Sequence, residues 1–305
     1  MATLKIQLFG KFGVRCGTQL VKGLEASKHQ ELLSYLLLRS DRCHPRETLA
    51  SMLWSDMPTE RSKKYLRQAL WHLQRTLTDC AGGSHFIIVT HDWIEITLKG
   101  IWLDVESFER LCAAGQGATG KKLKKSEAEM LMKAVKLYKG NLLDGWYQDW
   151  CLLERDRLQN LYLLTLDKLF AYSDKHKDYD AACAYASTIL ENDRARERTH
   201  RQLMRLLYKA GDRTGALRQY ERCVQALEEE LGVKPQKDTT DLYEHIRADI
   251  RKVSTDPIKF SSLTFASLPQ VLVRLKRLSF AVGDVHNGIE QDIKTLEQVL
   301  DNIRK

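Results

Sequence analysis

Apolar and polar residues alternate at the start of the chain. Residues 4–8, LKIQL, show this alternation, and residues 12–16, FGVRC, show it again after a glycine-flanked break. A period of two places one side of a strand toward a core and the other toward water. The pattern therefore predicts two short, half-buried antiparallel strands.

Three helices are predicted next. Ser27 and Gln30 indicate a capping box at the start of the first helix, whose leucines lie within residues 32–37. Pro45 stands where a second helix begins, because proline is tolerated at the first helical position. A third helix runs from about Glu60 to Thr78. It buries a stripe of leucines spaced by four, three and four residues: Leu66, Leu70, Leu73 and Leu77.

A β-hairpin follows the helices. Phe86–Val89 and Trp93–Thr97 flank the short turn Thr90-His91-Asp92. Strands, three helices and a hairpin form the order of a winged helix. In that fold the third helix enters the major groove of DNA.

The helical period of 3.6 dominates from Leu103 onward, and it contains an internal repeat. Residues 180–185, DAACAY, recur as residues 215–220, GALRQY, which is an offset of 35. Small residues followed by an aromatic at this spacing favour paired helices of the tetratricopeptide type. After Pro257, residues 289–303 carry apolar positions spaced by four and three. They indicate a short helical tail that either packs on its own domain or forms a dimer contact.

The third helix offers the strongest candidate chemistry. No acidic residue lies between Arg61 and Thr78, and the face opposite the leucines presents cations around Gln68. Cations neutralise phosphates, and glutamine can pair with an adenine edge in the major groove. The candidate DNA-binding residues are Arg61, Lys63, Lys64, Arg67, Gln68, His72 and Arg75.

Other chemistry is weakly supported. Residues 115–122, GQGATGKK, fit the spacing of a phosphate loop but lack its serine or threonine, and they follow a predicted helix instead of a strand. We read them as a basic loop between helices. Dispersed histidines and the absence of hydrolase, metalloprotease and dinucleotide motifs predict no enzyme, no metal and no cofactor. Trp146, Tyr147 and Trp150 are interpreted as core or interface packing.

Composition narrows the setting. Of 305 residues, 48 are basic and 40 acidic, so the net charge of +8 favours polyanionic partners. Seven scattered cysteines show no zinc or redox spacing, and neither a signal peptide nor a membrane span is predicted. A cytoplasmic location is expected.

The sequence resembles the SARP-type bacterial transcriptional regulators, in which an OmpR-type winged helix precedes a bacterial transcriptional activation domain. The resemblance covers roughly residues 3–252 and rests on segments such as RSKKYLRQALWHLQRTL in the first part and LEEELGVKPQKDTTDLYEHI in the second. It implies an α+β winged helix at residues 1–99 and an all-α tetratricopeptide-like helical-repeat domain at residues 100–254. The helical tail at residues 255–305 is predicted from its own periodicity and lies beyond the resemblance.

The resemblance also implies residue roles. Lys64, Gln68, Ala69 and His72 would face bases, and the remaining cations of the third helix would lie near phosphates. The hairpin turn lacks the glycine and arginine that wings of this family often carry.

The main hypothesis is a sequence-specific activator that binds promoter direct repeats as a homodimer and contacts RNA polymerase. One alternative is a helical-repeat adaptor whose winged helix binds proteins. Trp71 on the polar face and the acidic turn favour it. A weaker alternative is an ATP-dependent regulator that uses residues 115–121.

Overall fold

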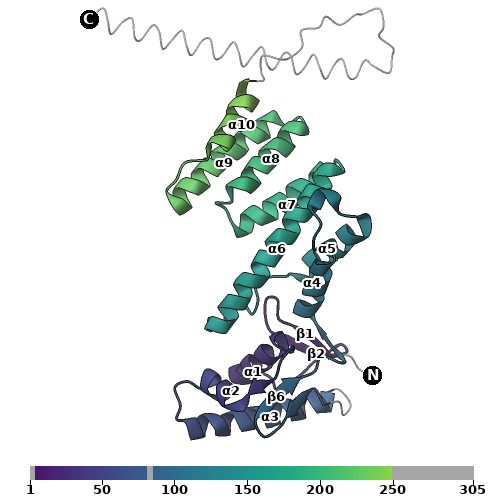
Figure 1. Ribbon diagram of the computed structural model, residues 1–305, viewed down its shortest axis with the longest axis vertical. Coiled ribbons are helices and arrows are strands. Elements are labelled where there is room, and N and C mark those ends of the chain that lie inside the picture. The colour runs from purple at the N-terminus through teal and green to yellow at the C-terminus, as the bar shows by residue number, and fades with distance from the viewer. Residues whose placement is uncertain (1–3, 81–84, 249–305) are drawn as a thin grey trace, which may run out of the picture. The chain divides into compact units, whose positions relative to one another are not determined.

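The computed structural model describes residues 4–80 and 85–248 (Figure 1). These described residues all belong to one compact unit. The predicted tail at residues 255–305 therefore lies outside the described residues. The described chain is mostly helical, with two small sheets in its N-terminal part.

The first sheet confirms the two predicted strands and adds two more. β1 (Leu4–Gln7) pairs antiparallel with β2 (Gly13–Cys16), which pairs with β3 (Gln19–Leu20). β7 (Ile101–Leu103) runs parallel to β1 on its other side. β7 was not predicted, because three residues are too few to show a period of two. As a result, a segment assigned to the second domain completes a sheet of the first.

The three helices and the hairpin occur in the predicted order. They are α1 (Ser27–Leu38), α2 (Arg46–Leu53), α3 (Thr59–Cys80), β5 (Ile87–Val89) and β6 (Trp93–Ile96). A further short strand, β4 (His44–Pro45), pairs with β6 in the order β4-β6-β5.

The predicted capping box is wrong. Ala26, not Ser27, is the N-cap of α1, and no side chain caps it. Gln30 instead donates its side-chain N–H to the carbonyl of Leu24, 2.7 Å away. The leucines of the three helices still pack into one core with the first sheet, as their spacing predicts.

The second part of the unit is a series of helices. They are α4 (Asp104–Ala113), α5 (Lys125–Leu137), α6 (Asp149–Lys175), α7 (Tyr179–Asn192), α8 (Glu197–Lys209), α9 (Arg213–Leu231) and α10 (Lys237–Ala248), with a 3₁₀ turn η1 (Gly120–Lys122) after α4. Successive helices from α6 to α9 pack side by side (Figure 1).

The internal repeat is present, but its offset is 34 and not 35. Asp178 caps α7 by accepting from the N–H of Ala181, and Asp212 caps α9 in the same way through Gly215. Buried Ala182 corresponds to buried Ala216 at this same offset. Matching residue types along the sequence gave an offset that is one residue longer than the offset of the helix caps and the buried alanines.

The loop at residues 115–122 connects helices. It follows α4 instead of a strand, and its lysines at positions 121 and 122 are exposed. Gly120 lies so close to α6 that an added Cβ would collide with the carbonyl of Lys168 and with Ala171. Helix packing therefore explains this glycine, and a phosphate cradle is not needed to account for it.

Among the three aromatic residues at positions 146–150, only part of the expected packing is found. Trp150 is buried and packs edge-on against Tyr35 of α1, with ring centroids 5.4 Å apart. Tyr147 is 79% exposed, so it is not part of the core, and of the two interpretations only interface packing is left for it.

Buried histidines predict a pH-dependent stability. The Nε2–H of His200 donates to the carbonyl of Arg194 at 2.8 Å, and its Nδ1 accepts from the side-chain amide of Gln219 at 2.6 Å, an arrangement that a neutral imidazole satisfies. Burial lowers the pKa of His200, and it does the same for the pKa of His29 and of His44. The unfolded chain then binds more protons than the folded chain, so stability is present above the ordinary pKa of 6.5 and is lost as the pH falls below it.

We expect the free energy of unfolding, measured in urea, to fall from about pH 7 to about pH 5, and His200→Gln to flatten that slope. An unchanged slope would contradict this.

Candidate nucleic-acid interface

Helix α3 has the amphipathic structure that its sequence predicts. Leu66, Leu70, Leu73 and Leu77 are buried in the core shared with α1 and α2. A stripe of leucines every three or four residues covers one side of a helix, so the opposite side must face away from that core.

The opposite side of α3 is open to solvent. Arg61, Lys64, Arg67, Gln68 and Arg75 are all exposed. Within residues 4–80 and 85–248 this side is not packed against the helical repeat. Such packing would have prevented α3 from entering a DNA groove. Four cations and one amide thus share a single accessible surface, which we call the α3 face.

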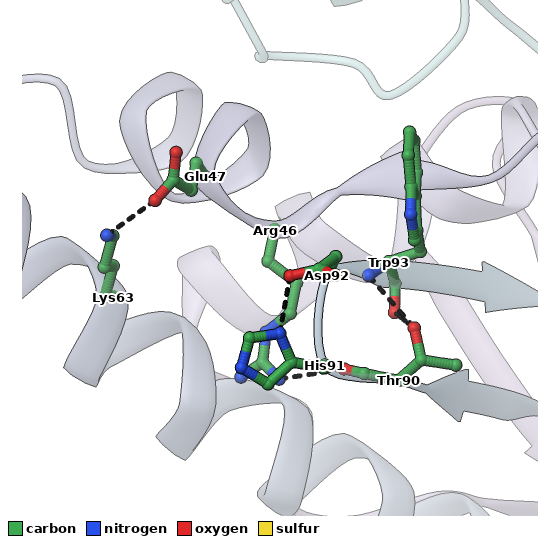
Figure 2. Close-up of polar contacts among 7 residues, drawn as sticks. All are labelled: Arg46, Glu47, Lys63, Thr90, His91, Asp92 and Trp93. Carbon is green, nitrogen blue, oxygen red and sulfur yellow. Dashed lines mark hydrogen bonds and ion pairs between the residues drawn. The ribbon is translucent and has the colours of Figure 1, made fainter.

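Lys63 is already paired. Its ammonium donates to the carboxylate of Glu47 in α2, 2.7 Å away (Figure 2). This hydrogen bond favours the charged form of both groups, because it lowers the pKa of Glu47 and raises the pKa of Lys63. Glu47 was not predicted as a partner of Lys63, because the two residues belong to different helices.

His72 lies at the edge of the α3 face and turns toward α1. Its ring stacks on that of His29, with centroids 4.5 Å apart and planes within 14°. The pKa of His29 is lowered by burial and by the neighbouring His72. Ala69 is only 2% exposed, so the expected contact between its methyl group and a base is wrong.

The hairpin turn is held against the start of α2. The backbone N–H and the guanidinium of Arg46 donate to the carbonyls of Asp92 and Thr90 at 2.9 and 3.0 Å. His91 pairs with Asp92 at 2.6 Å, and Thr90 is bonded to Trp93 across the turn (Figure 2). Arg46 is a second residue of the site that was not predicted. Its backbone N–H and its Nη1 thus both hold the turn against α2.

A cleft separates this turn from α3. It has a volume of about 710 Å³ and is lined by the start of α2, by Lys63, Leu66 and Arg67 of α3, and by His91, Asp92 and Trp93 of the turn. Cations lie on the α3 wall, and a carboxylate lies on the turn wall. A phosphate backbone could therefore approach along α3 more favourably than along the turn.

Neither a metal site nor a membrane-spanning helix is found among the described residues. There, no three histidine, cysteine, aspartate or glutamate side chains gather closely enough to hold a metal ion. Nor do the helices of the described ranges combine the length and the apolar character needed to cross a lipid bilayer.

Comparison with known proteins shows that this chain is similar to bacterial transcriptional regulators. The model of the bacterial transcriptional activator domain matches residues 103–247. The transcriptional regulatory proteins MoaR1 of Mycobacterium tuberculosis and of Mycobacterium bovis are each 26% identical over 239 residues, covering 75% of this chain and 74% of the relative. Residues 103–247 thus match a bacterial transcriptional activator domain, and the chain is similar to SARP-type transcriptional regulators.

A solved structure shares the fold of this chain. Mycobacterium tuberculosis EmbR, determined in complex with a low-affinity phosphopeptide, superposes with a TM-score of 0.69 at 18% identity. The match covers 82% of this chain but only 66% of the EmbR chain, which is less than two thirds of its length. At this identity the likeness supports the fold. The family points to regulation of transcription and away from an enzyme.

Proposed function

We propose that this chain is a SARP-type regulator that binds promoter DNA sequence-specifically and activates transcription. The observation that carries the proposal is the α3 face, where Arg61, Lys64, Arg67 and Arg75 surround Gln68 and remain exposed. A cationic helix surface with one amide near its centre suits the major groove, where phosphates lie on both sides and base edges form the floor.

The fold of the first part supports this proposal. Strands, α1, α2, α3 and the β5–β6 hairpin follow each other as in an OmpR-type winged helix, in which the third helix is the recognition helix. We therefore assign residues 1–99 to a winged-helix domain and residues 100–254 to the activation domain, whose first strand, β7, completes a sheet of the winged-helix domain.

The roles of the individual residues divide by position. Arg61, Arg67 and Arg75 contact phosphates, and Lys64 and Gln68 contact bases. Lys63 reaches a phosphate only after exchanging its bond to Glu47, and His72 reaches a base only after leaving the His29 stack. Both are therefore secondary contributors.

The resemblance to this family implies the assembly. Two copies bind neighbouring direct repeats head to tail. The helical repeat contacts the second copy or RNA polymerase, because stacked helix pairs present an extended surface suited to proteins.

Salt dependence tests the DNA-binding step. A mobility shift on the protein's own upstream region should show affinity falling steeply as salt rises, since each neutralised phosphate releases counterions. Affinity that is absent, or independent of salt, would refute the proposal.

Gln68→Ala is expected to relax base preference. The substitution removes a bidentate contact with a base but no cation, so affinity for a preferred site should fall by roughly 5- to 100-fold while affinity for random DNA stays nearly constant. Competition between the preferred and random duplexes measures the ratio. An equal loss on both would show that Gln68 reads no base.

Exposed aromatic and apolar side chains favour a second candidate, a protein-binding adaptor. Trp71, Ile88 and Trp93 are all exposed on α3 and the hairpin. This candidate predicts a complex with a protein and no salt-sensitive affinity for duplex DNA, so the same mobility shift separates the two.

A further inference from the structure

Trp71 is an unusual residue for the centre of a solvated surface. It is 60% exposed and lies on α3 between Gln68, three residues before it, and Arg75, four residues after it. Residues at this spacing are neighbours on a helix surface, so the indole stands among the groups proposed to contact DNA.

Arg75 holds the indole from one side. Its guanidinium carbon lies 5.4 Å from the centroid of the Trp71 ring, which is a cation–π arrangement. The same guanidinium lies 4.0 Å from Asp79, and both side chains are exposed. One ring face is therefore occupied within the protein, and the ring edge remains available.

The chemistry of a duplex limits what this edge can meet. Stacking on a base needs an unstacked base and a free ring face, and a closed duplex offers only base edges in its grooves. The apolar group among the major-groove edges is the C5 methyl of thymine. An apolar ring edge beside an amide that suits adenine thus matches a run of A·T pairs.

We propose that Trp71 is a specificity-determining residue that reads the C5 methyl of a thymine in the major groove, with its ring oriented by Arg75. This inference rests on the proposed function. Three residues of helix rise by about 4.5 Å, and successive base pairs by about 3.4 Å. The thymine therefore lies about one base pair from the adenine assigned to Gln68.

Replacing thymine by uracil tests this directly, because it removes the methyl and keeps the pairing and the O4 acceptor. The probe is a duplex selected from a random-sequence library by the full chain, with each thymine replaced singly by deoxyuridine. We expect one replacement to weaken binding by about fourfold, the effect of one buried methyl group, and to have no effect on Trp71→Ala. Trp93→Ala removes another exposed tryptophan, on the hairpin, and should keep the sensitivity of the parent.

The outcomes distinguish a failure of the role proposed for Trp71 from a failure of the proposed DNA-binding function. If the parent binds DNA in a salt-dependent way but ignores every uracil, or if Trp71→Ala remains equally sensitive, the role of Trp71 is wrong and the DNA-binding function stands. If the parent has no salt-dependent affinity for DNA, both are wrong. Since Trp71 is exposed and alanine favours helices, the variant should fold, which circular dichroism checks.

Discussion

Replacing both Arg61 and Lys64 with glutamate is expected to weaken binding to every DNA sequence by about a hundredfold or more. Both side chains lie exposed on the α3 face. Reversing Arg61 removes an attraction to a phosphate, and reversing Lys64 removes a contact with a base edge. Each new carboxylate also adds a repulsion from the nearby phosphates of about 1 kcal/mol in water. The plot of log affinity against log salt should also become shallower by about one, because the phosphate that Arg61 neutralises no longer releases its counterion. Titration of specific and random duplexes at several salt concentrations measures both effects.

A matched control separates the groove from net charge. Lys121→Glu with Lys122→Glu makes the same change in charge on the exposed turn after α4. Long-range steering alone should cost this variant much less affinity. If the α3 variant binds like the parent, the groove assignment is wrong. If both variants lose equally, the effect is one of overall charge.

Asp104→Ala is expected to destabilise the protein by about 3–5 kcal/mol. The buried carboxylate of Asp104, at the start of α4, accepts from the backbone N–H groups of Leu8 and Phe9, each at 2.9 Å, and from that of Val105 at 2.8 Å. Burial raises the pKa of Asp104, while these donors oppose the rise by stabilising the carboxylate. Its removal leaves two buried donors after β1 without a partner, at about 1–3 kcal/mol each. Urea unfolding of parent and variant gives the difference.

The expected loss is large because the bond is long-range in sequence. Asp104 joins the end of β1 to α4, residues 96 positions apart, beside the β1–β7 pairing. As a control, Asp178→Ala removes a helix cap on an exposed surface, which should cost only about 1 kcal/mol. Equal losses in the two variants would show that Asp104 acts as an ordinary cap.

The sequence predicted the surface of α3 better than the contacts of its individual residues. Its leucine stripe and its exposed cations follow from helical spacing, and both are found. The engagement of Lys63 by Glu47, and of His72 by His29, has no sequence signal, since the partners come from other helices. The Trp71–Arg75 pair could have been anticipated, because positions four apart on a helix are neighbours.

The offset of the repeat and the strand β7 also depended on contacts that the sequence pattern does not reveal. Matching letters placed the repeat at 35, whereas the caps Asp178 and Asp212 and the buried alanines place it at 34. β7 forms because β1 offers it a neighbouring backbone, and its own three residues carry too little pattern to predict it.

Local periodicity was therefore enough to derive the order of the elements and the helix side that meets solvent, because backbone geometry repeats every two or 3.6 residues and leaves a mark in the chain. Pairings between distant residues depend on how the elements pack together. They include the Asp104 bonds to β1, the hold of Arg46 on the hairpin turn and the histidine stack. Packing selects such partners by position in space and leaves no periodic trace, so they became visible only in the folded molecule.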